Sequence, residues 1–462
     1  MATSIAPDVS RVPGPASWLP GAAFLKFRRD PLAFFTHTQR TYGDIAGFSF
    51  GPQQFYLVSH PDSIEDVLVT SARKFKKGVA LQRAKRLLGE GLLTSEGKAH
   101  LKQRRTIQPL FHRQQVQRFA DAMVNHAVRW SDSVPPNAPI NITDQMGALT
   151  LAIVGETLFS SNVQGDVDDV REALAAAVES FGVSFLPGLE YIEKLPLPVF
   201  VRVRKARERL DRVIHRVIAE RRREAAARQQ SGDLIAMLLA ARDPENPDEA
   251  GMSDEQIRDE AMTIFLAGHE TTANAMAWTW HLLGSHPEVS RRLQSELSSV
   301  LGGRVPAVED VAKLEYARAV IAESMRLYPP AWTMGRRVLE EHTIAGHRIA
   351  AGSLVIMSQW VVHRDPRWWP DADRFQPARW LKSEAAAPSA TPAASGPRPK
   401  YAYFPFGGGT RICIGESFAW TEAILLLATI AQRWDFVPVS QPDPEPRITL
   451  RPRNLVMRSV PK

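Results

Sequence analysis

The feature that most constrains this sequence is its only cysteine, Cys413, which lies within residues 406–416. One cysteine permits no disulfide bond within the chain, and it excludes iron–sulfur clusters and cysteine-rich zinc sites, which need several cysteines. Three consecutive glycines precede it and let the backbone turn tightly against a flat ligand. Apolar residues at helical spacing follow it, and a thiolate is favoured at the N-terminus of such a helix. The segment can therefore hold an iron through one thiolate; the alternative is a structural cysteine beside a glycine turn.

The residues of this loop resemble a known signature. Phe406, Gly409, Arg411, Cys413 and Gly415 match the haem-binding motif of the cytochrome P450 superfamily. In that family the cysteine thiolate is the proximal ligand of haem b (iron protoporphyrin IX), and it pushes electron density toward the iron, which favours cleavage of the O–O bond. The resemblance implies that Cys413 is the iron ligand and that Phe406 and Arg411 also contact the haem.

The composition is that of an ordinary globular protein, with 44% hydrophobic and 23% charged residues in a chain of 462. No linker separates the motifs, so we expect a single domain over residues 1–462. The resemblance implies a mainly α fold with small β-sheets, in which a long central helix lies over the haem and a smaller lobe carries many of the strands. Residues 383–400 are rich in Ala, Pro and Ser, and we expect an exposed low-complexity insertion there.

A second stretch, residues 253–284, reads as one uninterrupted helix. Its start, Ser-x-x-Gln, is a capping box, and some 30 residues would make a helix of about 45 Å. Its middle, Ala-Gly-His-Glu-Thr-Thr, matches the family's Ala/Gly-Gly-x-Asp/Glu-Thr motif. The resemblance implies that Ala267 and Gly268 border the haem and leave room for oxygen, and that Glu270 and Thr271 relay protons during O–O cleavage. Without the cysteine downstream, these two residues would be read as part of a surface face.

Four basic residues are candidates for binding the two haem carboxylates. His100 and Arg104 lie four residues apart and therefore on one helix face, from which two donors can reach one anion. They match the family's aromatic-or-His-x-x-x-Arg pair; the alternative is a solvated basic face, because Lys102 lies between them. By resemblance, Arg336, one of two consecutive arginines, and Arg411 complete the set. Together they would neutralise carboxylates whose unpaired burial is costly.

A third motif is structural. Glu323 and Arg326 lie three residues apart in a helical segment and can pair across one face, although such a pair contributes little on a surface. The spacing matches the family's Glu-x-x-Arg, and Arg379 matches the arginine of its later Pro-x-Arg-aromatic motif. The resemblance implies that Glu323, Arg326 and Arg379 form a network behind the haem.

Local patterns predict further elements. Residues 74–93 read as irregular and, by resemblance, roof the haem. Residues 181–191 are apolar and match the family's mobile lid, although an ordinary helix connection explains them nearly as well. A C-terminal hairpin is expected to reach the pocket with its turn. The predicted helices span residues 31–42 and 61–70, the hairpins span 45–58 and 446–460, and the strand-like segments span 342–349 and 354–357.

The charge distribution and the sequences at the two ends of the chain indicate which partners and which location to expect. The formal net charge is +7, but basic residues are spread among acidic ones, so we expect an acidic protein partner and no nucleic acid. Neither a signal peptide nor a stretch of about 18 apolar residues occurs, so we expect no membrane span and a cytoplasmic location. The chain ends at Lys462, so no fused reductase is expected. The resemblance implies electrons from a ferredoxin or flavodoxin with an NAD(P)H-dependent reductase.

The sequence thus predicts a haem-thiolate monooxygenase that inserts one atom of O2 into a C–H or C=C bond. Its substrate is expected to be a small, apolar, lipid-like molecule: a fatty acid, a terpenoid or a steroid. Two alternatives remain open. One is an H2O2-driven peroxygenase, although peroxide-using members of the family generally lack the acid–alcohol pair. The other is a non-catalytic haem-binding sensor.

Overall fold

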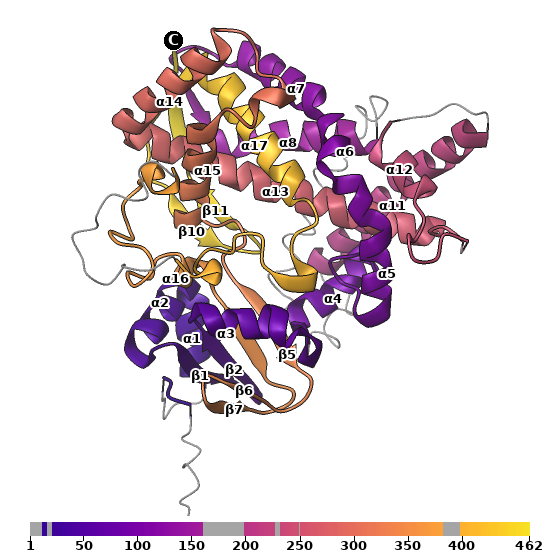
Figure 1. Ribbon diagram of the computed structural model, residues 1–462, viewed down its shortest axis with the longest axis vertical. Coiled ribbons are helices and arrows are strands. Elements are labelled where there is room, and N and C mark those ends of the chain that lie inside the picture. The colour runs from indigo at the N-terminus through magenta and orange to yellow at the C-terminus, as the bar shows by residue number, and fades with distance from the viewer. Residues whose placement is uncertain (1–11, 16–20, 160–197, 227–231, 249, 382–397) are drawn as a thin grey trace, which may run out of the picture. The chain divides into compact units, whose positions relative to one another are not determined.

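A computed structural model describes residues 12–15, 21–159, 198–226, 232–248, 250–381 and 398–462 of the chain (Figure 1). The chain divides into two compact units. Unit 1 consists of Met1–Val79, Ala331–Arg374 and Pro388–Cys413, and unit 2 consists of Ala80–Pro330, Phe375–Ala387 and Ile414–Lys462. The predicted lid at residues 181–191 and most of the predicted insertion at 383–400 lie outside the described residues. The expectation of one domain stays a prediction.

Unit 1 is built around a mixed sheet. Its helices are α1 (Ala22–Arg29), α2 (Pro31–Tyr42), α3 (Pro61–Glu65) and α16 (Gln359–Val362), with helical turns at Asp66–Thr70, Ala72–Lys74, Lys400–Ala402 and Gly409–Arg411. Its strands are β1 (Ile45–Phe50), β2 (Gln53–Val58), β3 (Phe75–Lys77), β5 (Met334–Val338), β6 (His342–Ile344), β7 (His347–Ile349) and β8 (Leu354–Met357).

The sheet of unit 1 has the strand order β1-β2-β8-β5-β3, and only the β2–β8 pair is parallel. The predicted hairpin at 45–58 is confirmed, and Phe48 of β1 stacks on Phe55 of β2 with ring centroids 5.5 Å apart. The predicted strand at 342–349 is instead the hairpin β6–β7, because Ala345 and Gly346 adopt positive φ and reverse the chain. The sheet and α3 bury an apolar core that includes Ile64 and Val355.

Unit 2 is mainly helical. Its helices are α4 (Val79–Leu88), α5 (Gly97–Ile107), α6 (Arg113–Gln117), α7 (Ala120–Ser133), α8 (Ile142–Phe159), α11 (Pro198–Ala226), α12 (Leu234–Ala240), α13 (Asp254–Ser285), α14 (Pro287–Leu301), α15 (Glu315–Leu327) and α17 (Glu416–Ala431), with helical turns at Gln108–Phe111, Val308–Asp310 and Pro377–Trp380. Its strands are β4 (Pro139–Asn141), β9 (Trp434–Pro438), β10 (Asp443–Pro446), β11 (Leu450–Arg453) and β12 (Val456–Pro461). The mostly helical fold with small sheets agrees with the predicted fold class.

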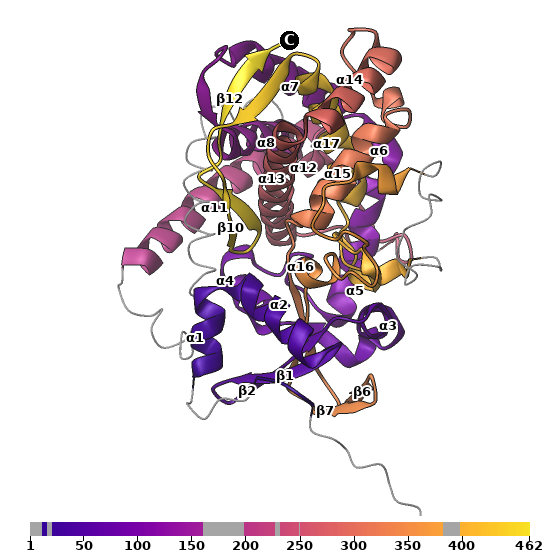
Figure 2. The same ribbon diagram turned by 90° about the vertical axis from the view of Figure 1, so that its left-hand side faces the viewer.

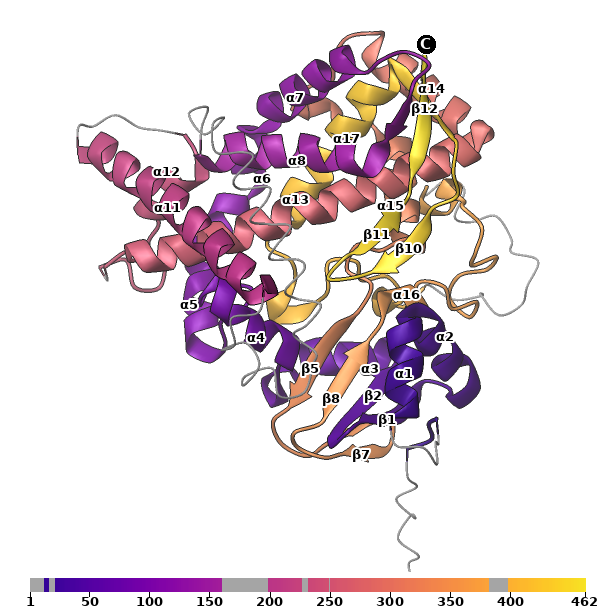
Figure 3. The same cartoon turned by 180° about the vertical axis from the view of Figure 1, so that it is seen from behind.

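The long central helix is α13, which has 32 residues and a length of about 48 Å. The Ser253 hydroxyl accepts the backbone N–H of Gln256, whose side chain accepts the Ser253 N–H, so the predicted capping box is present. The helix runs between α8 on one side and α15 and α17 on the other (Figure 2). Figure 3 shows it lying alongside α8 over much of its length. Such burial on both sides explains why most of its residues are apolar or small.

Two further predictions need correction. Residues 74–93 are not irregular throughout, because β3 lies near their start and α4 occupies their middle, where it buries Ala84 and Leu88 at helical spacing. The C-terminal hairpin is formed by β10 and β11, with Pro446 opposite Leu450, whereas β12 pairs with β9 and β4. Asn454 adopts a positive φ of 60° after β11 and turns the chain away from a longer hairpin. Among the described residues, no helix is long and apolar enough to cross a bilayer.

Candidate active site

The cysteine loop of unit 1 is shaped by its glycines. Gly407 and Gly409 adopt positive φ values of 76° and 67°, a region that other residues enter at a cost. A Cβ on Gly409 would lie 1.9 Å from the carbonyl oxygen of Leu68, so only glycine fits at that position. The backbone N–H of Cys413 donates to the Phe406 carbonyl (2.9 Å), and the Cys413 side chain is exposed in the structure. Cys413, the predicted iron ligand, therefore lies exposed at the end of a tight turn.

Strand β5 indicates which of the two consecutive arginines belongs to this loop. Arg336 is buried and lies two residues after Met334, so the two side chains are on the same face of the strand. The terminal methyl of Met334 approaches to 3.2 Å of the position that a Cβ would take on Gly407. Arg336 therefore shares a strand face with a residue that packs on the cysteine loop, whereas Arg337 points to the opposite face. The structure favours Arg336 over Arg337 as the arginine on the side of the cysteine loop.

The middle of α13 is open where the sequence predicts a place for oxygen. Ala267 is exposed although its neighbours along the helix are buried or half-buried. The Thr271 hydroxyl donates to the Ala267 carbonyl (2.7 Å), so its proton is engaged and its lone pairs are available to an incoming donor. A Cβ on Gly268 would lie 3.3 Å from Val154 of α8. The close approach predicted at Gly268 is therefore to α8, and Ala267 provides the open surface.

Glu270 belongs to a hydrogen-bonded chain that the sequence did not reveal. The Thr449 hydroxyl, in the turn between β10 and β11, donates to Glu270 Oε1 (2.7 Å). Asn274 Nδ2 in turn donates to the Thr449 oxygen (2.9 Å). Burial raises the pKa of Glu270. The hydrogen bond from Thr449 and the positive charges of the nearby Arg451 and Arg447 oppose this rise. The turn of the C-terminal hairpin thus reaches α13 and positions the predicted acid.

A second buried carboxyl, that of Glu422 in α17, interacts with Thr272, the residue that follows Thr271 in α13. Glu422 lies in the apolar interior of α17 and is completely buried. This burial raises its pKa to about 8, and the hydroxyl of Thr272 only partly opposes the shift. Glu422 is therefore protonated near neutral pH. No motif in the sequence marks it, because a single glutamate in an apolar helix has no characteristic spacing.

His269 lies between the predicted functional residues but packs as an apolar group. Its ring stacks on Phe265 of the preceding turn, with centroids 6.3 Å apart. Burial lowers its pKa to about 4, so the imidazole is neutral at physiological pH. Among the residues that the structure describes, no cluster of three or more His, Cys, Asp or Glu side chains could hold a metal ion.

The predicted carboxylate-binding pair lies on α5. His100 is buried and Arg104 is half-buried, one helical turn apart, whereas Lys102 between them is exposed. The adjacent Arg105 forms an ion pair with Asp243, whose carboxylate lies 2.8 Å from Arg105 Nη2. The face that carries His100 and Arg104 is thus not simply a solvated basic face.

The predicted structural network is present within unit 2. Glu323 and Arg326 of α15 are both completely buried and form two hydrogen bonds of 2.9 Å. Arg379 Nε donates to Glu323 Oε1 (2.9 Å), and Trp380 Nε1 donates to Oε2 (2.9 Å). Burial alone would raise the pKa of Glu323, but Arg326, Arg379 and the backbone N–H of Gln376 together lower it. Trp380, where the family more often has Phe, is an additional donor that sequence reasoning missed.

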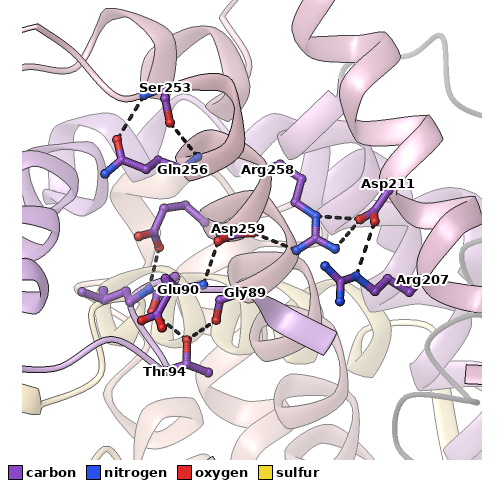
Figure 4. A network of polar contacts seen from close by, with 12 residues as sticks. Gly89, Glu90, Thr94, Arg207, Asp211, Ser253, Gln256, Arg258 and Asp259 are labelled. Atoms are coloured by element: carbon purple, nitrogen blue, oxygen red, sulfur yellow. Dashed lines mark hydrogen bonds and ion pairs between the residues drawn. The ribbon is translucent and has the colours of Figure 1, made fainter. Parts of the chain in front are cut away.

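The connection between α4 and α5 is anchored on the first turns of α13 (Figure 4). The Glu90 backbone N–H donates to Asp259 Oδ2 (2.7 Å), and Arg258 Nη1 donates to Asp259 Oδ1 (2.8 Å). Arg258 Nε also donates to Asp211 of α11 (2.6 Å). A Cβ on Gly89, which has a φ of 72°, would lie 2.0 Å from the Asp259 carboxylate. We call residues 89–94 the α4–α5 strap, and its backbone follows α13 closely.

Both units contain features that suit a haem. In unit 1, an exposed thiol ends a glycine turn, and a single thiolate is the donor that a haem-thiolate iron requires. In unit 2, the exposed Ala267 opens α13 beside the Thr271 hydroxyl, and α5 offers His100 and Arg104 as donors to carboxylates. The chemistry and local geometry of the residues present therefore fit this cofactor.

Comparison with known proteins identifies the family. The family model for Cytochrome P450 matches residues 12–461. The chain is 35% identical to the Cyclooctat-9-en-7-ol 5-monooxygenase of Streptomyces melanosporofaciens over 94% of this chain and 93% of the relative. It is 36% identical to the Cyclooctatin synthase of the same organism, over 95% and 93% of the two chains. It is 34% identical to the Pentalenene oxygenase of Streptomyces avermitilis, over 95% and 94%. The chain therefore belongs to the cytochrome P450 family and is a haem-thiolate monooxygenase.

Proposed function

We propose that this monooxygenase oxidises a terpenoid, inserting one oxygen atom into a C–H or C=C bond. Three relatives that align over nearly their whole length are named for cyclooctat-9-en-7-ol, cyclooctatin and pentalenene. The first is an alkenol and the last an alkene, and both names denote carbocyclic, largely apolar molecules of this class. Terpenoids are also one of the three substrate classes that the apolar segments of the sequence suggest.

The observation that carries the oxygenase assignment of this site is the arrangement on α13. An open position at Ala267 adjoins a threonine whose hydroxyl donates to the Ala267 carbonyl and an acid that is held by a side chain from another element. A site that must deliver protons to oxygen needs a buried acid with a defined hydrogen-bond route. Glu270, Thr271 and Ala267 supply these parts within one helical turn.

We assign the remaining roles by matching the family motifs residue by residue. When bound, the haem supplies the iron at which O2 is activated. Cys413 would hold that iron through its thiolate, and the turn at Phe406 would fix the position of the sulfur. His100, Arg104, Arg336 and Arg411 would bind the haem carboxylates as charge-assisted donors. Glu323, Arg326 and Arg379 have a structural role.

In the proton step, Glu270 takes up and releases protons while Thr271 holds the hydrogen-bond geometry. Its raised pKa makes Glu270 easier to protonate near neutral pH than an ordinary glutamate. The Thr449 hydroxyl donates to one carboxylate oxygen and so leaves the other oxygen to carry the proton. Asn274 holds the Thr449 oxygen and thereby fixes the direction of this donation.

Electrons come from a ferredoxin or flavodoxin with an NAD(P)H-dependent reductase. Exposed basic residues on α5 and near α6 form a candidate docking surface in unit 2. They are Lys98, Lys102, Arg113 and Arg118. Helix α6 packs against α17, which begins three residues after Cys413 in the chain. An acidic surface on the partner protein would be attracted to these basic residues over distances at which dissolved salt does not screen the charges.

The substrate class is tested by titrating the purified ferric protein with terpene hydrocarbons and alcohols, fatty acids and steroids. We expect a saturable low-to-high-spin shift of the Soret band with terpenoids, followed by hydroxylated product when redox partners and NAD(P)H are added. A shift and product with fatty acids or steroids alone would overturn the terpenoid assignment. A Thr271→Ala variant that keeps full coupling of electrons to product would contradict the proposed proton step.

A further inference from the structure

A completely buried histidine holds the beginning of the cysteine loop in unit 1. His363 Nε2 accepts a hydrogen bond from the backbone N–H of Phe404 (3.0 Å). The backbone N–H of His363 itself donates to the Gln359 carbonyl (2.9 Å), so the imidazole is carried by the last turn of α16. A backbone N–H can only donate, and Nε2 therefore carries the lone pair while the proton resides on Nδ1.

The contact at Phe404 is connected to Cys413 by two backbone hydrogen bonds. The Phe404 carbonyl accepts the N–H of Gly407 (2.9 Å), which closes the turn before the glycines. The Phe406 carbonyl, inside that turn, accepts the N–H of Cys413 (2.9 Å). A shift of Phe404 would therefore move the carbonyl that receives the cysteine N–H. The position of the thiolate depends in this way on where the turn is anchored.

A second buried side chain supports the same segment. Trp369 is completely buried, and its Nε1–H donates to the Ala402 carbonyl (3.2 Å). The His363 ring also packs edge-on against the Phe404 ring, with centroids 5.3 Å apart. A donor and an acceptor from residues 363–369 thus hold residues 402–404 at two adjacent points. Of these two hydrogen bonds, the one to His363 involves Phe404, the residue that opens the turn.

We infer that His363 is a positioning residue for the thiolate, acting through the Phe404 N–H. The inference rests on the proposed role of Cys413 as the iron ligand. Outer hydrogen bonds that orient a metal ligand commonly tune the properties of the metal as well as fixing the geometry of the ligand. Loss of the His363 acceptor would leave a buried N–H unpaired, loosen the turn and weaken thiolate ligation.

The test compares three variants of the haem-loaded protein. His363→Phe keeps a ring of similar size without an acceptor, and His363→Gln keeps an acceptor at similar reach. His281→Phe is the matched control, because His281 is also buried but lies on α13 in unit 2. The measurements are amide hydrogen exchange of the peptide covering residues 401–413, the thiolate band of the reduced carbon monoxide complex, and the haem midpoint potential.

We expect exchange of this peptide in His363→Phe to accelerate by roughly threefold to tenfold, the factor that a hydrogen bond of ordinary net strength implies. The fraction of the carbon monoxide complex with the thiolate band should fall and the midpoint potential should shift. His363→Gln should restore all three readouts in large part. His281→Phe should leave them unchanged even if it lowers the melting temperature.

Several outcomes would overturn the inference. Wild-type exchange and a full thiolate band in His363→Phe would remove the positioning role, as would equal effects of His363→Phe and His281→Phe. If His363→Phe does not fold, His363→Met takes its place, because its flexible side chain fills the space with only a weak acceptor. A wild-type protein that lacks the thiolate band would instead contradict the role of Cys413 itself.

Discussion

Thr449 lies 179 residues after Glu270 in the chain, yet its hydroxyl donates to the Glu270 carboxylate over 2.7 Å. At the scale of single residues, the chemistry of the site is set by such neighbours. Burial raises the pKa of Glu270 and hydrogen bonding lowers it, so the balance between the two decides when the acid is protonated. Removing one neighbour should shift that balance in a defined direction.

We predict that Thr449→Val reduces coupling of electrons to product by roughly threefold to tenfold, because a hydrogen bond of ordinary net strength to the Glu270 carboxyl is lost. The pKa of Glu270 should rise further, since Thr449 now opposes the effect of burial. The pH profile of coupling should therefore move to higher pH. The measurement is product formed per NAD(P)H consumed across pH, with Thr449→Ser as the control that keeps the hydroxyl. Identical profiles for the Val and Ser variants would contradict the relay.

Glu422 gives a prediction for stability. Its pKa in the folded protein is about 8, above the value of an ordinary glutamate, so the folded state binds more protons than the unfolded state between these two values. The free energy of unfolding should therefore decrease as pH rises through that window, by an amount on the order of a few kcal/mol. Glu422→Gln should flatten this dependence. Chemical denaturation at several pH values checks it, and equal slopes for both proteins would refute it.

At the scale of elements, polar contacts fasten neighbouring segments to α13 and α15. The α4–α5 strap gives its Glu90 N–H to Asp259 and its Leu92 N–H to Glu260 (2.8 Å), two consecutive carboxylates of α13. Arg258, the residue before them, binds α11 through Asp211. Three consecutive residues of one helix thus hold a loop on one side and a helix on the other. The strap can approach this closely only because it contains glycine.

We predict that Gly89→Ala destabilises the protein more than Gly97→Ala does. Both glycines have positive φ, 72° and 58°, and an alanine in that region costs about 1 to 2 kcal/mol. Nothing lies within 4 Å of a Cβ on Gly97, whereas a Cβ on Gly89 would displace the Asp259 carboxylate from its partners. The loss of those hydrogen bonds should add about 1 to 3 kcal/mol. Denaturant-induced unfolding measures both, and equal costs would argue against a tight strap.

Two substitutions in the network on α15 compare the cost of losing one hydrogen bond with the cost of leaving a buried charge without its partner. Glu323→Ala leaves the completely buried Arg326 without its carboxylate, and breaking a buried pair in this way costs about 3 to 5 kcal/mol. Trp380→Phe removes one donor of 2.9 Å and keeps the ring, so its cost should be near 1 to 2 kcal/mol. Unfolding of the two variants under the same conditions gives both values. A Trp380→Phe cost as large as that of Glu323→Ala would show that packing dominates.

At the scale of the whole molecule, the formal net charge of +7 bears on electron delivery. Long-range attraction of an acidic partner raises the rate of encounter, and it is screened beyond about 10 Å at 0.1 M salt. The distribution of exposed charge, more than the total, decides where such a partner binds. The candidate docking surface and the basic helix α11 offer a direct comparison.

We predict that Arg113→Glu slows reduction by an acidic ferredoxin, whereas Arg204→Glu on α11 has little effect. Both residues are exposed and both variants change the net charge equally, so only the location differs. The rate for the wild-type protein should also fall as ionic strength rises through about 0.1 M. Stopped-flow reduction of the haem measures these rates. Equal slowing by both variants would show that total charge, and not this surface, governs the encounter.

The sequence by itself determined those features whose cause is local. The glycine turn before Cys413, the capping box at Ser253 and the periodicity of α13 depend on residues close together in the chain, so their patterns were readable before the fold was known. The spacing of Glu323 and Arg326 on one turn of a helix is equally local. The motif matches then indicated the cofactor and predicted the residues for the chemistry.

Only the tertiary structure decided which distant residues complete these motifs. Thr449 reaches Glu270, Trp380 reaches Glu323, and Thr272 meets Glu422, because separate elements pack together and exclude water. Burial and the partners that packing brings to each carboxyl together set its protonation, and both are properties of packing that no local spacing encodes. The same reason explains why the turn held by His363 was not apparent from the sequence, since its acceptor and donor lie 41 residues apart.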